Sequence, residues 1–432
     1  MSKSTRTEAG FPEVEDSRGA TVKFARQVAD QAPLDEIVRQ GAQRMLQAAI
    51  DAEVAEFIEK HRDRTDDDGN RLVVRNGYLP QREITTGAGQ LAVRQPRVRD
   101  NSDSADQRVS FTPKILPSYL RKSKSLEEFI PWLYLKGIST NDFNEVLGKL
   151  FGREVDGFSA NVVTRLKERW SQEYDQWNRR SLTDKKYVYI WADGIHSNVR
   201  LESPENKKQC LLVLIGATAD GKKELIAVCD GFRESEQSWR EMLLDLKHRG
   251  LELSPKVAVG DGALGFWAAL RKEFPDTREQ RCWVHKTANV LNKMPRSVQP
   301  KAKADLHEIW MAPTRDSGYR ALDAFVEKYG AKYAAACECL TKDRDELMTF
   351  YDFPAEHWSH LRTTNPIEST FATIRLRHRR TKGCGTRLAS LTMMFKLAQS
   401  AERKWRRLNG HELIIYLIQG KNFVGGVMQE AA

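Results

Sequence analysis

Two aspartates, Asp193 and Asp261, each end a short apolar run and directly precede a glycine. The runs, Val188–Ala192 and Val257–Gly260, predict buried strands. Attack on a phosphodiester requires stabilising charge at both the attacking and the leaving oxygen, which two divalent cations about 4 Å apart can supply. Such hard cations need carboxylate oxygens that face one cleft. Asp193 and Asp261 are therefore candidates for a metal site of this kind.

Asp-Gly is also a common turn dipeptide, and Asp220 and Asp230 precede glycine as well. A hairpin turn explains Asp220, whereas Asp230 ends a strand-like run and remains a weaker competitor. Strand order favours Asp193 and Asp261, because their strands are expected to be parallel neighbours and the two acids would then meet. Ligand sites of open α/β sheets collect beyond the carboxyl ends of the strands. The glycine after each acid would let the backbone turn away without crowding the metals.

A third acid is expected from a helix that packs across the sheet. Asn365 can cap such a helix, Pro366 suits its first position, and Glu368 falls in the first turn. The helix would bury an apolar stripe at helical spacing: Ile367, Phe371 and Ile374. Glu368 is surrounded by Arg and Lys residues and could equally be an acid that stabilises the start of the helix. The residues alone leave both interpretations open.

The elements around these acids predict an α/β fold. Strands are expected at 187–193, 209–218, 224–230, 256–260 and 278–285, with helices at 235–249 and 263–274. The order β-β-β-α-β-α-β is that of a ribonuclease H-like catalytic core, a mixed sheet flanked by helices. Residues 184–285 would form its first part and residues 286–360 an α-helical insertion. Residues 361–432 would complete the core with the Glu368 helix and basic C-terminal helices.

The first half of the chain has a different pattern. Residues 1–33 are interpreted as a flexible arm, and residues 34–183 as a mainly helical DNA-binding region. Within it we expect a helix at 34–62, a β-hairpin formed by 82–86 and 90–98, and helices at 125–135, 140–151 and 160–180. The last two resemble a helix-turn-helix in outline, and the second carries three basic residues: Arg165, Lys167 and Arg169. A helical bundle with a solvated basic face is the alternative.

Composition narrows the class of protein. The 432 residues include 69 Lys and Arg against 59 Asp and Glu, a net charge of +10. This excess favours a polyanionic partner, DNA or RNA, although many proteins are as basic for no specific reason. The first thirty residues lack the apolar region of a secretory signal, and the longest apolar stretch, Cys210–Ala219, is half a membrane span. Six scattered cysteines are expected to be reduced thiols. A cytoplasmic protein without membrane contact is expected.

Eight stretches form a series along residues 34–425: Arg75–Tyr78, Pro96–Asp100, Ser123–Glu127, Leu135–Thr140, Trp191–His196, Val259–Trp267, Gln280–Leu291 and Asn365–Phe371. Together and in this order they resemble the Mutator-type transposases of bacterial insertion sequences. The resemblance implies a DDE triad of Asp193, Asp261 and Glu368 that binds two Mg²⁺ ions, with Mn²⁺ able to substitute. It also implies that the protein cleaves DNA at the element ends and joins the freed 3′-hydroxyl to target DNA. The N-terminal region would bind the terminal inverted repeats. The protein would act on double-stranded DNA as a homodimer or higher multimer. Such a protein would be associated with the bacterial nucleoid.

A Cys-x-x-His pair, Cys282 and His285, follows the second aspartate and is also a feature of this family. A zinc site would need two further ligands, for which Cys337 and Cys339 are candidates, but residues two apart on a helix point to different faces. Support of the active site or of the insertion's docking is favoured. His196 could touch DNA or substrate water, or could be an ordinary surface histidine.

Basic residues after Glu368 are further candidates for DNA contact: Arg375, Arg377, Arg379, Arg380 and Lys382. Besides an active transposase, two alternatives remain open. One is a catalytically silent DNA-binding regulator derived from a transposase. The other is a structure-specific nuclease on the same ribonuclease H-like fold.

Overall fold

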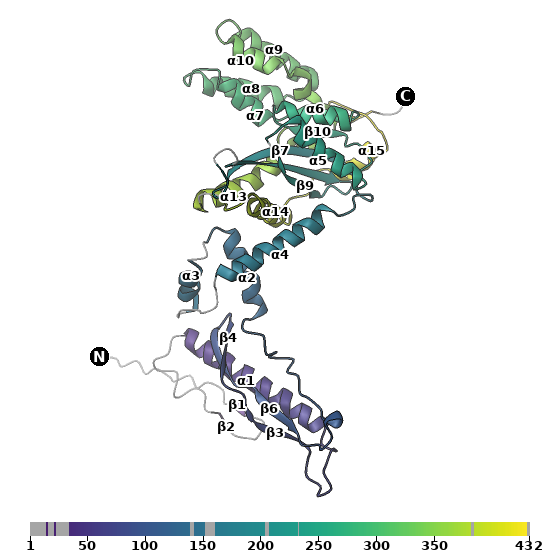
Figure 1. Ribbon diagram of the computed structural model, residues 1–432. Helices are drawn as coiled ribbons and strands as arrows, with labels where there is room; N and C mark the ends of the chain where they lie inside the picture. The colour runs from purple at the N-terminus through teal and green to yellow at the C-terminus, as the bar shows by residue number, and fades with distance from the viewer. Residues whose placement is uncertain are drawn as a thin grey trace, which may run out of the picture. The chain divides into compact units, whose positions relative to one another are not determined.

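The computed structural model describes residues 14–15, 21–22, 34–138, 142–151, 160–203, 207–231, 233–381 and 384–429. The chain divides into two compact units: Met1–Tyr134 with Ile138–Ala160, and Leu135–Gly137 with Asn161–Ala432 (Figure 1). No helix within the described ranges is both long and apolar enough to cross a membrane. The expected arm at 1–33 lies outside the described residues, except for the paired strands β1 (Val14–Glu15) and β2 (Thr21–Val22).

The first unit combines one long helix with short antiparallel strand pairs. Helix α1 (Leu34–Lys60) agrees with the expected helix, and β4 (Arg82–Thr86) pairs with β5 (Gly89–Val93) as the expected hairpin. Four buried residues form a common core: Ile50, Ile84, Val93 and Leu116. Helices α2 (Lys124–Leu135) and α3 (Asp142–Phe151) follow. The connection from α3 to the next helix lies outside the described residues, so the helix-turn-helix remains a prediction.

The expected strand over 90–98 is wrong in one respect, because it is two strands. After β5 the chain leaves the hairpin, and β6 (Pro96–Asp100) pairs instead with β3 (Val73–Tyr78), a strand the sequence did not predict. The break has a clear cause at Arg94. Its N–H donates to the side chain of Gln47 at 2.9 Å, and its carbonyl accepts from the same amide at 2.9 Å. Both backbone groups are thus satisfied by α1 rather than by a neighbouring strand.

The second unit is built on a five-stranded mixed sheet with the order β11-β10-β7-β8-β9. Its strands are β7 (Tyr187–Asn198), β8 (Lys208–Thr218), β9 (Lys223–Gly231), β10 (Val257–Gly260) and β11 (Arg278–Arg281). The first three are antiparallel, whereas β10 runs parallel to β7 and β11 runs parallel to β10. The expected mixed α/β sheet is confirmed.

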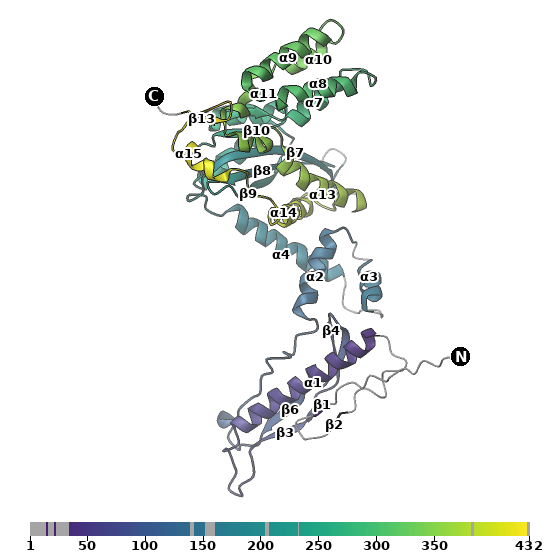
Figure 2. The same cartoon turned by 180° about the vertical axis from the view of Figure 1, so that it is seen from behind.

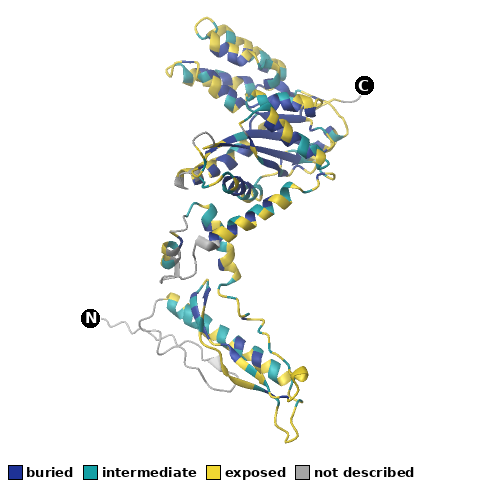
Figure 3. Cartoon of the chain, viewed as in Figure 1, coloured by how far each residue is buried: buried dark blue, intermediate teal, exposed yellow. Residues whose placement is uncertain are grey.

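Helices cover both faces of this sheet (Figures 1 and 2). On one face α5 (Glu236–His248) and α6 (Leu264–Glu273) bury aromatic and aliphatic side chains against β7 and β8, including Trp239, Leu243, Phe266 and Leu270. On the other lie α13 (Asn365–Thr381) and α14 (Arg387–Glu402). The strands between the two layers are almost wholly buried (Figure 3). The ladder that carries Asp193 is therefore shielded from solvent on both faces.

Two further parts of the second unit frame this sandwich. Helix α4 (Ala160–Asn178) donates from the hydroxyl of Tyr174 to the carbonyl of Val228 in β9 at 2.8 Å. Between β11 and α13 stand mainly helices: α7 (Trp283–Leu291), α8 (Gln299–Met311), α9 (Arg315–Tyr329), α10 (Ala334–Thr341), α11 (Arg344–Met348) and α12 (Trp358–Leu361). After α14 come α15 (Ile414–Ile418) and the short strands β12 (Phe423–Val424) and β13 (Val427–Met428).

Candidate active site

Asp193 lies in the middle of β7 and not at its end, as the sequence had suggested. The strand continues to Asn198 because every residue from Tyr189 to Asn198 has a partner on β8. Asp193 is 7% exposed, and its Oδ1 accepts the N–H of Gly194 at 2.8 Å. On the other edge, β10 pairs with β7 only as far as Gly260 opposite Ala192. Asp193 therefore stands at the point where the parallel neighbour ends.

Asp261 is the residue that follows this last pair, so it leaves β10 beside Asp193. Its Oδ1 accepts the N–H of Ala263 at 2.8 Å, which closes a turn before α6. Its carbonyl accepts from the indole of Trp267 at 2.8 Å and from the guanidinium of Arg281 at 3.2 Å. These bonds fix the backbone at Asp261. The expected placement of the two acids on adjacent parallel strands agrees with the pairing of β10 and β7, and the charge of Asp261 acts on Asp193.

Glu368 lies in the first turn of α13, as its capping pattern predicted. The expected apolar stripe is confirmed, since all three of its residues are buried: Ile367, Phe371 and Ile374. The Glu368 carboxylate has two cationic partners. Oε1 lies 3.3 Å from Nε2 of His285, and Oε2 lies 3.1 Å from Nη1 of Arg375. The side chain is thus held in place by charge from a neighbouring helix and from two turns further along its own.

The expected strand over 278–285 is wrong in its second half. The strand stops at Arg281, Cys282 caps α7, and His285 lies on the first turn of that helix. The sulfur of Cys282 accepts from the N–H and the hydroxyl of Thr364, each at 3.4 Å, directly before α13 begins. Cys282 and His285 therefore tie the start of the inserted helices to the helix that carries Glu368. The favoured supporting role of this pair agrees with these contacts.

The electrostatics of the site follow from these neighbours. Burial, followed by the charge of Asp261, raises the pKa of Asp193 to about 7. Contacts with Cys282 and then Glu368 raise the pKa of His285 to about 11, so the imidazole is a cation at neutral pH. The hydrogen bond from His285 lowers the pKa of Glu368. Burial favours the neutral thiol of Cys282, but hydrogen bonds from His285 and Thr364 outweigh it and lower its pKa.

These residues fit a divalent cation site. The ligand atoms of Asp193, His285 and Glu368 all lie within 4.8 Å of one another. The carboxylate of Asp193 is buried and ionises reluctantly among other acids, a situation that a hard cation relieves. As a protonated donor to Glu368, His285 is placed to orient that acid rather than to bind a metal itself. Cys282 belongs to neither group of metal-ligating side chains found in the described part of the chain.

The competing acids have structural explanations. Asp230 forms an ion pair with Arg387 at the start of α14, with 2.5 Å between Nη2 and Oδ1, and accepts from Gln209 at 2.8 Å. Asp220 lies in the turn between β8 and β9 beside Lys222.

The basic candidates differ in exposure. Arg375 and Arg379 are exposed on α13, whereas Arg377 is buried. The side chain of Arg380 and the whole of Lys382 lie outside the described residues. On α4, Arg165 and Arg169 are exposed and Lys167 is half-buried.

His196 lies beside two residues that sequence reasoning missed, Cys210 and Glu234. Its Nε2 is 3.3 Å from Oε1 of Glu234. Nothing in the local sequence marks either partner, since Cys210 sits within an apolar strand and Glu234 within a polar connection. Strand pairing places His196 beside Cys210, and the connection after β9 brings Glu234 over Gly194 to join them.

Comparison with known proteins identifies the family. Residues 16–407 match the family described as Transposase, Mutator family. The chain is 48% identical over 305 residues to the transposase for insertion sequence element IS6120 of Mycolicibacterium smegmatis, covering 71% of this chain and 93% of that protein. It is 51% identical over 290 residues to the transposase for insertion sequence element IST2 of Acidithiobacillus ferrooxidans, covering 66% and 95%.

Among solved structures, the Drosophila P element transposase strand transfer complex matches 75% of this chain and 85% of that chain, with 10% identity and a TM-score of 0.29. A likeness this weak carries no argument about the site. The family assignment depends on the family match over residues 16–407 and on the two relatives, which cover 71% and 66% of the chain; both agree with the resemblance first noted in the motifs. The chain belongs to the Mutator family of transposases.

Proposed function

We propose that this transposase cuts DNA at the ends of an insertion sequence and joins the freed 3′-hydroxyl to target DNA, with Asp193, Asp261 and Glu368 as its DDE triad. The observation that carries the proposal is geometric. Asp193 on β7 and Glu368 on α13 have ligand atoms within 4.8 Å of each other, and Asp261 directly follows the last residue of β10 that pairs with β7. The strand order of the sheet supports a ribonuclease H-like core, interrupted by helices α7–α12.

The three acids would hold the divalent cations, Mg²⁺ in our proposal with Mn²⁺ able to substitute. Two such ions, when bound, stabilise the charge on the attacking and leaving oxygens of a phosphodiester. The protein's own contribution is positioning. His285 donates to Glu368 and Arg375 pairs with its other oxygen, so the third acid keeps its orientation. The ladder on β8 and the bonds around Asp261 fix the other two.

DNA binding is proposed for two basic sets. Residues 34–183 would bind the terminal inverted repeats, with Arg165, Lys167 and Arg169 among the contacts. The set after Glu368 would contact phosphates near the acids. The exposure of Arg375 and Arg379 supports this second assignment. Action as a homodimer or higher multimer at the nucleoid completes the proposal, because two element ends must be cut together.

The test is Mg²⁺-dependent nicking of a supercoiled plasmid that carries both element ends. Asp193→Asn, Asp261→Asn and Glu368→Gln should each abolish nicking while binding to the element ends persists. Asp220→Asn is the matched control, since Asp220 is another Asp-Gly aspartate of the same sheet but lies in a turn. Unchanged nicking by Asp193→Asn would refute the assignment. Cutting of branched DNA without preference for the ends would indicate a structure-specific nuclease instead.

A further inference from the structure

A second group of metal-ligating side chains lies on the opposite face of β7 from Asp193. It consists of His196 on β7, Cys210 on β8 and Glu234 after β9, and their ligand atoms all lie within 4.8 Å of one another. Side chains alternate along a strand, so Asp193 and His196 project to different faces. Cys210 belongs to the core beneath α5 and α6, which confirms the side. This group therefore lies on the opposite face of β7 from Asp193, although burial and then the charge of Asp261 raise the pKa of Glu234.

The backbone dictates the meeting of the three side chains. His196 and Cys210 are direct partners across the antiparallel pair β7 and β8, so their side chains stand next to each other on one face. Glu234 reaches them by crossing Gly194. A Cβ built on Gly194 would lie 2.4 Å from Oε1 of Glu234, so any larger residue there would displace the carboxylate.

The chain before Glu234 adopts an uncommon conformation. Arg233 has a φ of 103°, and it is the one non-glycine residue with positive φ in the part of the chain that the structure describes. A residue with a Cβ is strained in this region, and such strain persists where surrounding contacts hold it. The backbone of Glu234 also packs closely against Gly265 of α6, because a Cβ at Gly265 would lie 2.3 Å from the carbonyl oxygen of Glu234. The connection between β9 and α5 is thus held against β7.

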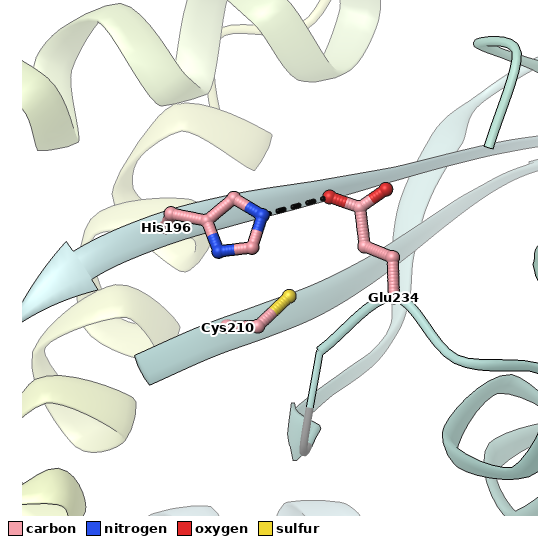
Figure 4. Close-up of side chains that lie close together, drawn as sticks. All are labelled: His196, Cys210 and Glu234. Carbon is pink, nitrogen blue, oxygen red and sulfur yellow. Dashed lines mark ion pairs between the residues drawn. The ribbon is translucent and has the colours of Figure 1, made fainter. Parts of the chain in front are cut away.

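The ligand atoms of His196, Cys210 and Glu234 indicate which metal ion the group would bind. Figure 4 shows the sulfur of Cys210 directed toward the imidazole of His196 and the carboxylate of Glu234. A thiol, an imidazole and a carboxylate form a set that suits Zn²⁺, whereas Mg²⁺ takes oxygen ligands. Cys210 is buried, but the side chain of His196 is 60% exposed. The solvent edge leaves room for water as the fourth ligand of a tetrahedral site.

We propose that His196, Cys210 and Glu234 bind Zn²⁺ at a site separate from the catalytic acids. As the metal–sulfur bond forms, the thiol proton of Cys210 passes to solvent, so the bound ligand is the thiolate. The ion joins β7, β8 and the connection between β9 and α5 at one point. This inference goes beyond the proposed DNA chemistry and does not depend on it.

Co²⁺ binding to the metal-free, full-length protein tests the proposal. Co²⁺ should produce a thiolate charge-transfer band in the near ultraviolet, and Zn²⁺ should displace it. Cys210→Ser should remove the band. Cys229→Ser, which removes the thiol of the adjacent strand β9, is the matched control and should keep it. The variant Asp193→Asn/Glu368→Gln should also keep the band, which separates this test from that of the proposed function.

Two further variants guard against a Cys210→Ser protein that fails to fold. His196→Ala and Glu234→Gln should weaken Zn²⁺ binding by about 100-fold or more, because loss of even an outer partner of a metal ligand weakens binding about 10- to 100-fold. Their folding is checked by circular dichroism before the titration. Absence of the band in the wild-type protein, or its survival in Cys210→Ser, would overturn the proposal. Loss of the band in the Asp193→Asn/Glu368→Gln variant would show that metal binding at Cys210 depends on the catalytic acids and would also overturn the proposal of a separate site.

Discussion

Ionisation of the buried Asp193 carboxyl should lower the free energy of unfolding of the metal-free protein. The pKa of this carboxyl is raised from 3.8 to about 7, chiefly by burial and then by the charge of Asp261. Between about pH 4 and pH 7 the native state therefore binds more protons at this position than the unfolded state does. The free energy of unfolding falls as the pH rises through this window, because ionisation is easier in the unfolded chain. Asp193→Asn removes the ionisation and should relieve the penalty.

The size of the effect follows from the pKa. At about 1.36 kcal/mol per pH unit, the rise amounts to on the order of 4 kcal/mol at pH 8, an upper limit for a group with several charged neighbours. At pH 5 the native carboxyl is protonated, and the advantage of the variant should shrink to about 1.5 kcal/mol. The substitution itself is mild, since the amide oxygen of Asn can still accept the N–H of Gly194.

Urea denaturation followed by tryptophan fluorescence measures this difference in EDTA at pH 5 and pH 8. Nine of the ten tryptophans lie in the second unit, all except Trp132, so the signal reports the unit that contains the site. Added Mg²⁺ should stabilise the wild-type protein and narrow the gap, because the ion binds the native carboxylates. An Asp193→Asn protein no more stable than the wild type at pH 8 in EDTA would refute the reasoning.

Three other predictions concern ion pairs of the second unit. His285→Ala removes the donor to Glu368 and should reduce Mg²⁺-dependent nicking about 10- to 100-fold. Binding to the element ends, measured by gel shift, should not weaken. Full nicking activity would contradict the positioning role of His285. Arg387→Ala breaks the pair with Asp230 and should lower the free energy of unfolding by about 1–2 kcal/mol in urea, with no loss expected if the pair is only a surface contact. Lys286→Met removes the closer cationic partner of Asp343 in the inserted helices and leaves only Arg281, 3.8 Å away, so it should lower the free energy of unfolding by about 1–3 kcal/mol. An unchanged denaturation midpoint would argue against a stabilising pair.

The sequence predicted well wherever local pattern and final environment agree. The run before Asp261 is uniformly apolar and becomes β10, buried on all four residues. The stripe through Ile367 and Phe371 has helical spacing and is buried as expected. In both places the residues that become buried are close together in the sequence, so the local pattern alone predicts the element.

The sequence-based predictions are wrong where contacts between residues far apart in the chain determine the secondary structure. Nothing after Asp193 marks a strand, yet β7 continues because β8 offers a ladder as far as Lys208. The segment Cys282–His285 contains β-prone residues but starts a helix, and its partners Thr364 and Glu368 come some eighty residues later. His285 was therefore recognisable as a family feature but not as the donor to the third acid.

The two cations that hold Glu368 have a consequence for how the site is loaded. His285 and Arg375 neutralise the acid that a divalent ion would need. Filling the proposed site would then be an exchange of counter-ions, in which the metal takes over part of the charge compensation while the carboxylate keeps the orientation that His285 gives it. In the proposed site, Asp193 and Asp261 would be the ligands held by the sheet, and Glu368 would be the ligand whose charge partners change when a metal binds.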